Sequence, residues 1–198
     1  MMNVTITDAN RAEDLLRALG DQLTLTGESF HIVVVGGSAL LALGLVERPT
    51  RDVDVVAFHT GTALRPAGTL PPALVEARDR VARDLGLPQD WLNSGPADLL
   101  DFGLPEGFGE RLTTRERGPA LTVSFASRLD QIHLKLYATV DAGGPGKHEQ
   151  DLRALEPTRE ELLAAARWSR THDPSEGYHE MLRDALAFFG VEDADLGA

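Results

Sequence analysis

The chain of 198 residues contains no cysteine, and this absence limits the chemistry open to it. Without thiols it forms no disulfide bond, holds no metal through thiolates and has no cysteine nucleophile. The absence is compatible with a reducing compartment, and we expect a cytoplasmic protein. No stretch approaches the roughly 20 consecutive apolar residues that cross a bilayer, and no basic segment followed by an apolar run opens the chain. The sequence therefore predicts no membrane span and no targeting segment.

Basic residues are also scarce, because 19 lysines and arginines stand against 31 acidic residues, which gives a net charge of −12. At this charge we expect no long-range attraction to nucleic acid or to an anionic membrane, so a polyanion would need a local basic patch. The segment 111–135 is the one region where basic residues are in excess. Its charged residues are Arg111, Arg115, Arg117, Arg128 and Lys135 against Glu116 and Asp130.

Several motifs of well-known enzyme classes are missing. No glycine-rich run ends in Lys-Ser or Lys-Thr, no third glycine completes a dinucleotide-binding turn, and no Gly-x-Ser-x-Gly is present. The six histidines lack the spacing of zinc ligands. These absences argue against a P-loop, a dinucleotide-binding domain, a serine-hydrolase turn and a zinc site.

Hydrophobic periodicity predicts an α/β protein of the mixed α+β kind. Apolar residues recur at helical spacing over 8–23, and a β-branched run over 30–35 predicts a strand that ends at two glycines. A buried helix over 38–45 and a second strand over 52–58 follow. Glycines and prolines over 60–72 predict a surface loop.

The remaining pattern predicts a change from mixed to helical structure. The elements expected there are a helix over 74–87, irregular chain over 91–109, antiparallel strands over 110–117 and 120–127, and helices over 128–140, 147–155, 158–172 and 175–189. The glycine-rich run that starts at Asp141 is the expected boundary. We therefore predict a mixed sheet flanked by helices over 1–140 and a helical part over 141–198.

The segment 33–56 carries the most informative residues. Gly36 and Gly37 follow a strand and precede a helix, so backbone N–H groups there are unpaired and no Cβ hinders a phosphate, to which Ser38 could also donate. Asp52 and Asp54 lie two apart on a strand, which points both carboxylates to one face, where divalent cations bind oxygen ligands. Phosphate binding beside a metal-binding carboxylate pair is what nucleotidyl transfer requires.

This arrangement of a glycine turn, about a dozen residues and an Asp-apolar-Asp strand resembles the polymerase-β-like nucleotidyltransferase superfamily. The Arg-Pro-Thr-Arg run at 48–51 resembles its AbiEii-type group, which includes toxins of toxin–antitoxin pairs. Trp91-Leu92-Asn93 and the segment 134–152 are also similar to that group. The resemblance covers roughly residues 28–157.

The resemblance implies a role for several further residues. Asp52 and Asp54 would be catalytic metal ligands for two Mg²⁺ ions, and Lys135 would contact the phosphates of a nucleoside triphosphate (NTP). Arg51 would join the glycine turn in nucleotide binding, and Asp151 would be a further active-site acid. The superfamily's third carboxylate is not evident on the strand over 120–127. The candidates for it are Asp151, Glu116, Asp98 and Asp101.

Three functional hypotheses follow. The leading one is a metal-dependent nucleotidyltransferase that moves a nucleoside monophosphate to a hydroxyl of tRNA, a protein or a small molecule; as a toxin it would have a cognate antitoxin as partner. The second is a catalytically silent nucleotide-binding or regulatory module that acts through a protein partner. The third is a purely structural interaction domain, which requires the segment 33–56 to match by coincidence.

Overall fold

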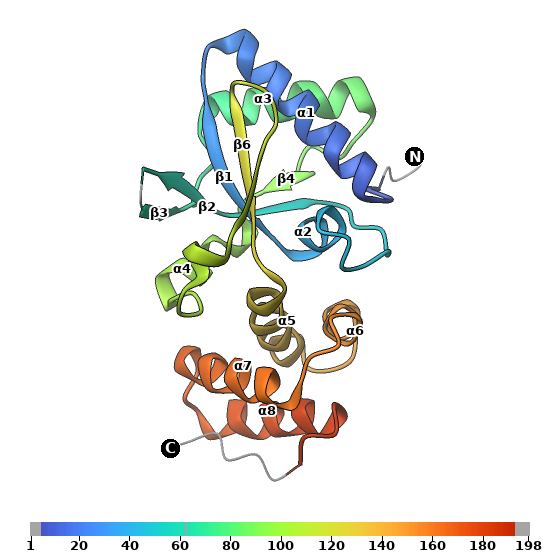
Figure 1. The fold of residues 1–198 in the computed structure, drawn as a ribbon, viewed down its shortest axis with the longest axis vertical. Coiled ribbons are helices and arrows are strands. Elements are labelled where there is room, and N and C mark those ends of the chain that lie inside the picture. Colours follow the sequence, from blue (N-terminus) through green and yellow to red (C-terminus); the bar gives the residue numbers. More distant parts are fainter. Residues whose placement is uncertain (1–4, 62, 193–198) are drawn as a thin grey trace. The chain divides into compact units, whose positions relative to one another are not determined.

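The computed structural model describes residues 5–61 and 63–192, and in them the predicted mixed α/β class is confirmed (Figure 1). The chain divides into two compact units, Met1–Ser127 and Arg128–Ala198. The first unit contains a mixed sheet of six strands with helices, and the described residues of the second unit form helices. Within the described ranges, no helix is both long and apolar enough to cross a membrane.

The sheet of the first unit runs in the order β3-β2-β1-β6-β5, and β4 pairs with β2. Its strands are β1 (Phe30–Val35), β2 (Val53–Thr60), β3 (Ala63–Pro66), β4 (Leu92–Asn93), β5 (Thr113–Glu116) and β6 (Leu121–Phe125). β1 is antiparallel to β2 and parallel to β6, so the sheet is mixed. The predicted antiparallel pairing of the strands on either side of Gly118 is confirmed by β5 and β6.

The helices of the first unit are α1 (Ala9–Thr26), α2 (Gly36–Ala42), α3 (Pro72–Leu85) and the short α4 (Leu99–Phe102). α1 begins after Asp8, whose side chain accepts a hydrogen bond from the Arg11 N–H. α1 and α3 pack together on one face of the sheet, where their leucines meet Ile32 and Val34 of β1 in the buried core (Figure 1). A Cβ at Gly20 of α1 would lie 2.0 Å from a backbone oxygen, so this packing tolerates only glycine there.

The prediction of a plain loop over 60–72 was wrong in part, because Ala63–Pro66 forms the edge strand β3 against β2. Glycine at position 61 has φ +65 and allows the tight reversal between the two strands. Pro66 ends an edge strand, where its missing N–H leaves no inner partner unpaired. Cross-strand hydrogen bonds therefore outweigh a local composition that disfavours regular structure.

The second unit is built from α5 (Arg128–Asp141), α6 (Lys147–Ala154), α7 (Arg159–His172) and α8 (Glu176–Phe188). The division falls after Ser127 and not at the glycine-rich run from Asp141, because α5 packs against α6, α7 and α8. Thr158 and Glu161 form a capping box at the start of α7. Arg128 donates two hydrogen bonds to the Glu161 carboxylate, which joins the start of α5 to that of α7.

Candidate active site

The glycine turn after β1 lies directly against the segment that carries the two aspartates. Gly36 has φ +76, and a Cβ there would stand 2.7 Å from Oδ2 of Asp54. A Cβ at Gly37 would stand 2.9 Å from Oγ1 of Thr50. Both distances are shorter than real Cβ contacts, so a side chain at either position would displace the Asp54 carboxylate or the Thr50 side chain. The glycine turn and the segment with the two aspartates, which are separated in the sequence, are therefore in contact in the structure.

Asp52 and Asp54 lie at the start of β2. Asp54 is on the strand and pairs in register with Val35, the last residue of β1, while Asp52 immediately precedes the strand. The alternate residues Val53 and Val55 are buried in the core cluster. Because side chains alternate along a strand, the Asp54 carboxylate points away from that core.

Neighbouring residues hold both carboxylates by hydrogen bonds. The Nδ2 group of Asn93, on β4, donates to Oδ1 of Asp54 over 3.1 Å, and Oδ1 of Asn93 accepts from the Gly95 N–H over 2.8 Å. The Thr50 hydroxyl donates to Oδ1 of Asp52 over 3.3 Å. The Gly95 contact orients the Asn93 amide so that its N–H points at Asp54. These contacts restrict the conformations available to the two acids.

One basic residue and one hydroxyl lie at the glycine turn. The guanidinium of Arg48 approaches Gly37, since Nη2 would be 3.7 Å from a Cβ there, whereas Arg51, the predicted nucleotide ligand, is exposed. Ser38 is 2% exposed, and among the described residues its hydroxyl has no hydrogen-bond partner. A buried hydroxyl without a partner costs about 1–3 kcal/mol, so a bound oxygen ligand or a water molecule would stabilise it.

Lys135 and Asp151, the other two predicted site residues, belong to the second unit. Lys135 Nζ lies 2.7 Å from Oδ2 of Asp151, and the two side chains are 6% and 0% exposed. They join α5 to α6 as a buried ion pair. The structure thus brings these two together in one unit, and it brings Gly36, Gly37 and Asp54 together in the other.

The other candidates for a third acid are all exposed in the first unit. Glu116 lies on the edge strand β5, Asp98 in a single 3-10 turn and Asp101 in α4. Within the part of the chain that is described, no group of three His, Asp or Glu side chains is placed to hold a metal ion. Asp54 approaches Gly36 of the turn directly, and Asp52 is bonded to Thr50, whose hydroxyl approaches Gly37.

A separate polar cluster lies on β1, β6 and β5. His31 Nε2 is 2.7 Å from Oγ of Ser124, which is 2.7 Å from Oγ1 of Thr114, and the His31 ring stacks on His59 with centroids 4.7 Å apart. Burial lowers the pKa of His31, and the charge of His59 lowers it further. Ser124 is fully buried, so this serine–histidine pair is a structural contact and not an accessible nucleophile.

Three residues of this site were not identified from the sequence as ligands or supports. The sequence marks Asn93 only as part of the Trp-Leu-Asn resemblance, and Arg48 and Thr50 only as part of the run before Asp52. Comparisons of the chain with protein-family models, curated proteins and solved structures found no match. The resemblance to nucleotidyltransferases therefore rests on the motif residues of the sequence.

Proposed function

We propose that the first unit is a nucleotidyltransferase module that transfers a nucleoside monophosphate from a Mg²⁺-bound NTP to a hydroxyl acceptor. The observation that carries this proposal is the approach of Gly36 to the Asp54 carboxylate. It puts the half-buried Gly36 backbone next to the Asp54 carboxylate, and Asp52 lies two residues before Asp54. Triphosphate binding and metal binding are thereby adjacent, although the residues come from separate segments.

The residues present fit a magnesium ion that arrives with its nucleotide. Mg²⁺ in phosphoryl-transfer sites commonly takes one or two carboxylates and completes its shell with water and substrate phosphates. Asp52 and Asp54 supply that number of carboxylates, and Thr50 and Asn93 hold them in place. When bound, the metal neutralises phosphate charge and stabilises the pyrophosphate leaving group.

The remaining residues of the turn have roles in binding and orientation. Gly36 is half-buried and has no side chain, so its backbone is the part of the turn that a triphosphate would approach. The Arg48 guanidinium beside Gly37 adds positive charge, and the buried Ser38 hydroxyl offers a donor to a phosphate oxygen. The acceptor oxygen forms a bond to the α-phosphorus, the bond to pyrophosphate breaks, and the hydroxyl proton is lost to solvent.

The ion pairs of the basic segment 111–135 indicate which class of acceptor is favoured. Arg117 pairs with Glu13, Arg128 with Glu161 and Lys135 with Asp151. Arg115, a further cation of this segment, donates a hydrogen bond to the Ala42 carbonyl. Cations that are already paired release fewer counterions on binding a polyanion, so this segment supports a protein or small-molecule hydroxyl as acceptor more than tRNA.

One observation favours the second hypothesis, a silent module that binds nucleotide and acts through a protein partner. Within the described ranges the aspartate pair has no third acid close enough to complete a metal-binding group. Two carboxylates can still hold a Mg²⁺-nucleotide. This hypothesis therefore predicts binding without turnover, which an experiment can distinguish from transfer.

The test incubates the protein with Mg²⁺ and one α-labelled NTP at a time, in the presence of total RNA, of other proteins, or of no added acceptor. Both label transfer and pyrophosphate release are followed. A variant with Asp52→Ala and Asp54→Ala removes the acids, and Asp21→Ala on the exposed surface of α1 is the matched control. We expect transfer or pyrophosphate release that the control retains and the double variant loses.

Thermal stabilisation by Mg²⁺-NTP separates the hypotheses when no product forms. Stabilisation that disappears in the double variant, without turnover, would support the silent module and overturn transfer. Neither turnover nor stabilisation with any of the four nucleotides would overturn both. In that case the structural interaction domain is the hypothesis that remains.

A further inference from the structure

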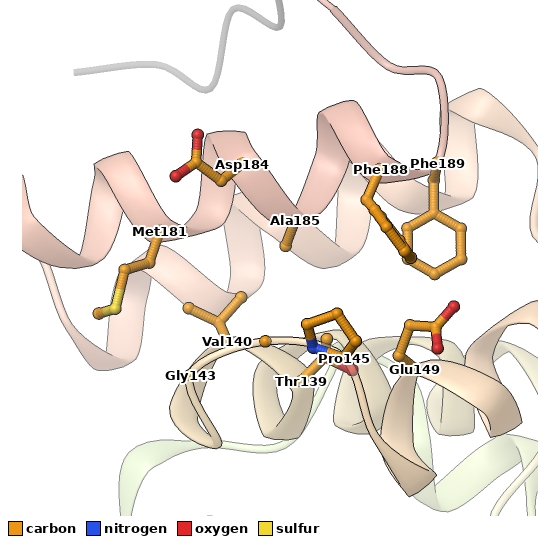
Figure 2. A pocket seen from close by; sticks show the side chains of 11 residues that line it. Thr139, Val140, Gly143, Pro145, Glu149, Met181, Asp184, Ala185, Phe188 and Phe189 are labelled. Atoms are coloured by element: carbon orange, nitrogen blue, oxygen red, sulfur yellow. The ribbon is translucent and has the colours of Figure 1, made fainter.

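The second unit contains a cavity of about 320 Å³ between the end of α5 and α8, with a mostly apolar wall (Figure 2). The carboxylate of Asp184 points away from this cavity, and that of Glu149 pairs with Arg153. Neither charge is directed into the cavity unpaired, so the wall selects no ligand by charge. Selectivity requires polar groups that are held in one orientation, and the segment 91–95 of the first unit carries such a group.

The backbone of the segment 91–95 is fixed to the elements beside it. Trp91 is 1% exposed, and its indole N–H donates to the Arg78 carbonyl on α3 over 3.1 Å. The carbonyl of Trp91 accepts from the Val53 N–H of β2 over 2.6 Å. The segment is thereby joined to both α3 and β2, so the side chain of Asn93 starts from an anchored backbone.

The amide of Asn93 is held at both of its ends. Its oxygen accepts from the Gly95 N–H over 2.8 Å, and since an N–H only donates, this bond fixes which end of the amide is the oxygen. The Nδ2 group then faces Asp54, the register partner of Asn93, and donates to Oδ1 over 3.1 Å. Oδ2 of Asp54 lies on the side of Gly36, 2.7 Å from where a Cβ would stand. The two oxygens of Asp54 therefore face different neighbours.

An amide N–H on one oxygen changes how a carboxylate binds a metal ion. Ca²⁺ accepts both oxygens of one carboxylate in a flexible shell of about 6–8 oxygen ligands, whereas Mg²⁺ requires near-octahedral geometry and keeps several waters. The hydrogen bond from Asn93 makes Oδ1 of Asp54 a poorer second ligand. Binding through Oδ2 alone suits Mg²⁺ and leaves Ca²⁺ with one ligand fewer.

We propose that Asn93 is a positioning residue that makes Asp54 bind metal through one oxygen and thereby gives the site its preference for Mg²⁺ over Ca²⁺. Asn93 acts through Asp54 and does not itself touch the metal. This inference rests on the proposed function, because it concerns the ion that arrives with the nucleotide. It adds the residue that sets the specificity for that ion.

Selective labelling with ¹⁵N-asparagine tests the contact in the full-length protein without metal or nucleotide. The chain has three asparagines, at positions 3, 10 and 93, so the side-chain amides give few signals, and Asn93→Asp identifies the one beside Asp54. Asp54→Ala removes the acceptor of the hydrogen bond. We expect the Asn93 amide proton signal to move upfield in this variant. An unmoved signal would show that Asn93 does not hold the carboxylate, and would overturn the inference.

Metal specificity is measured by thermal stabilisation in the presence of α,β-methylene nucleoside triphosphates, which do not react. Each of the four nucleotides is tested with Mg²⁺ and with Ca²⁺, and the two half-saturating metal concentrations are compared. Asn93→Ala frees Oδ1 for Ca²⁺, so we expect it to lower the preference for Mg²⁺ roughly tenfold. Asn93→Asp keeps the oxygen that accepts from Gly95 and replaces the donor by a second acceptor, so it should lower the preference at least as much.

Ser94→Ala is the matched control. The Ser94 hydroxyl donates to the Gly68 carbonyl, so its loss loosens the same segment without removing a contact to Asp54. The control should keep the metal preference of the parent, because a general loss of stability weakens the binding of both ions alike.

The outcomes separate this inference from the proposed function. A preference for Mg²⁺ that is unchanged in Asn93→Ala, or that falls equally in Ser94→Ala, would overturn the inference and leave the proposed function standing. Equal binding of Mg²⁺ and Ca²⁺ by the parent would do the same. If neither ion stabilises the parent with any of the four nucleotides, the proposed function is overturned, and the inference with it.

Discussion

The contact between Gly36 and Asp54 predicts the energetic effect of one added methyl group. In Gly36→Ala a non-glycine residue must adopt φ +76, which costs about 1–2 kcal/mol. The new Cβ would also stand 2.7 Å from Oδ2 of Asp54, so the carboxylate must move and weaken its hydrogen bond from Asn93, at a further cost of about 1 kcal/mol. Gly44→Ala is the matched control, because Gly44 has φ +69 and a Cβ added there would have nothing within 4 Å.

The two costs can be separated by a double-mutant cycle with Asp54→Ala. That change removes the carboxylate and keeps its Cβ, which lies at an ordinary 3.7 Å from the added methyl group. In this background Gly36→Ala should cost only what Gly44→Ala costs in the parent. The coupling free energy between positions 36 and 54 is thus expected to be about 1 kcal/mol.

Urea unfolding followed by tryptophan fluorescence is the assay. The chain has two tryptophans, one in each unit, so a Trp168→Phe background leaves the buried Trp91 to report on the first unit alone. A change of 1 kcal/mol corresponds to roughly 2–4 °C in Tm for a chain of this size. Equal costs of Gly36→Ala in both backgrounds would show that the carboxylate does not lie against the turn, and would remove the main support for the proposed function.

Three further predictions concern single contacts. Asn93→Ala should lower the free energy of unfolding of the first unit by about 1 kcal/mol. Asn93→Asp should lower it further at neutral pH, because this change places a second carboxylate against Asp54. Urea unfolding at pH 7 and pH 5 measures the effect of each variant. Because the pKa of His31 lies below its usual 6.5, its stabilising contribution is complete above pH 6.5 and is lost as the pH falls through the lowered value; His31→Gln should flatten the dependence of Tm on pH between pH 8 and 5. Removing one partner of the buried pair, as in Asp151→Leu, should cost about 3–5 kcal/mol in urea unfolding, and Lys135→Met with Asp151→Leu should recover most of it.

Each of these predictions has an outcome that would contradict it. Equal stability of the Asn93→Ala and Asn93→Asp variants at pH 7 would contradict the close contact with Asp54. If His31→Gln leaves the dependence of Tm on pH unchanged, groups other than His31 cause the loss of stability at acid pH. A double variant of Lys135 and Asp151 as unstable as the single one would show that packing at these positions, and not the unpaired charge, sets the cost.

The sequence by itself determined the elements whose pattern is local. The strands over 30–35 and 52–58 and the helices over 8–23 and 158–172 follow from the period of their apolar residues, and capping residues such as Thr158 mark their ends. The placement of Asp54 on the face opposite the core also follows from the period of a strand. These features depend on residues a few positions apart, and the sequence displays such relations directly.

Only the tertiary structure decided the contacts between distant segments. β3 forms in a stretch rich in glycine and proline because β2 supplies its hydrogen bonds, and the two-residue β4 exists only as a partner of β2. Asn93 reaches Asp54 across 39 positions, and Lys135 pairs with Asp151 where α5 packs on α6. The residue types at these positions are compatible with many partners, and the partner is chosen by how the strands and helices pack.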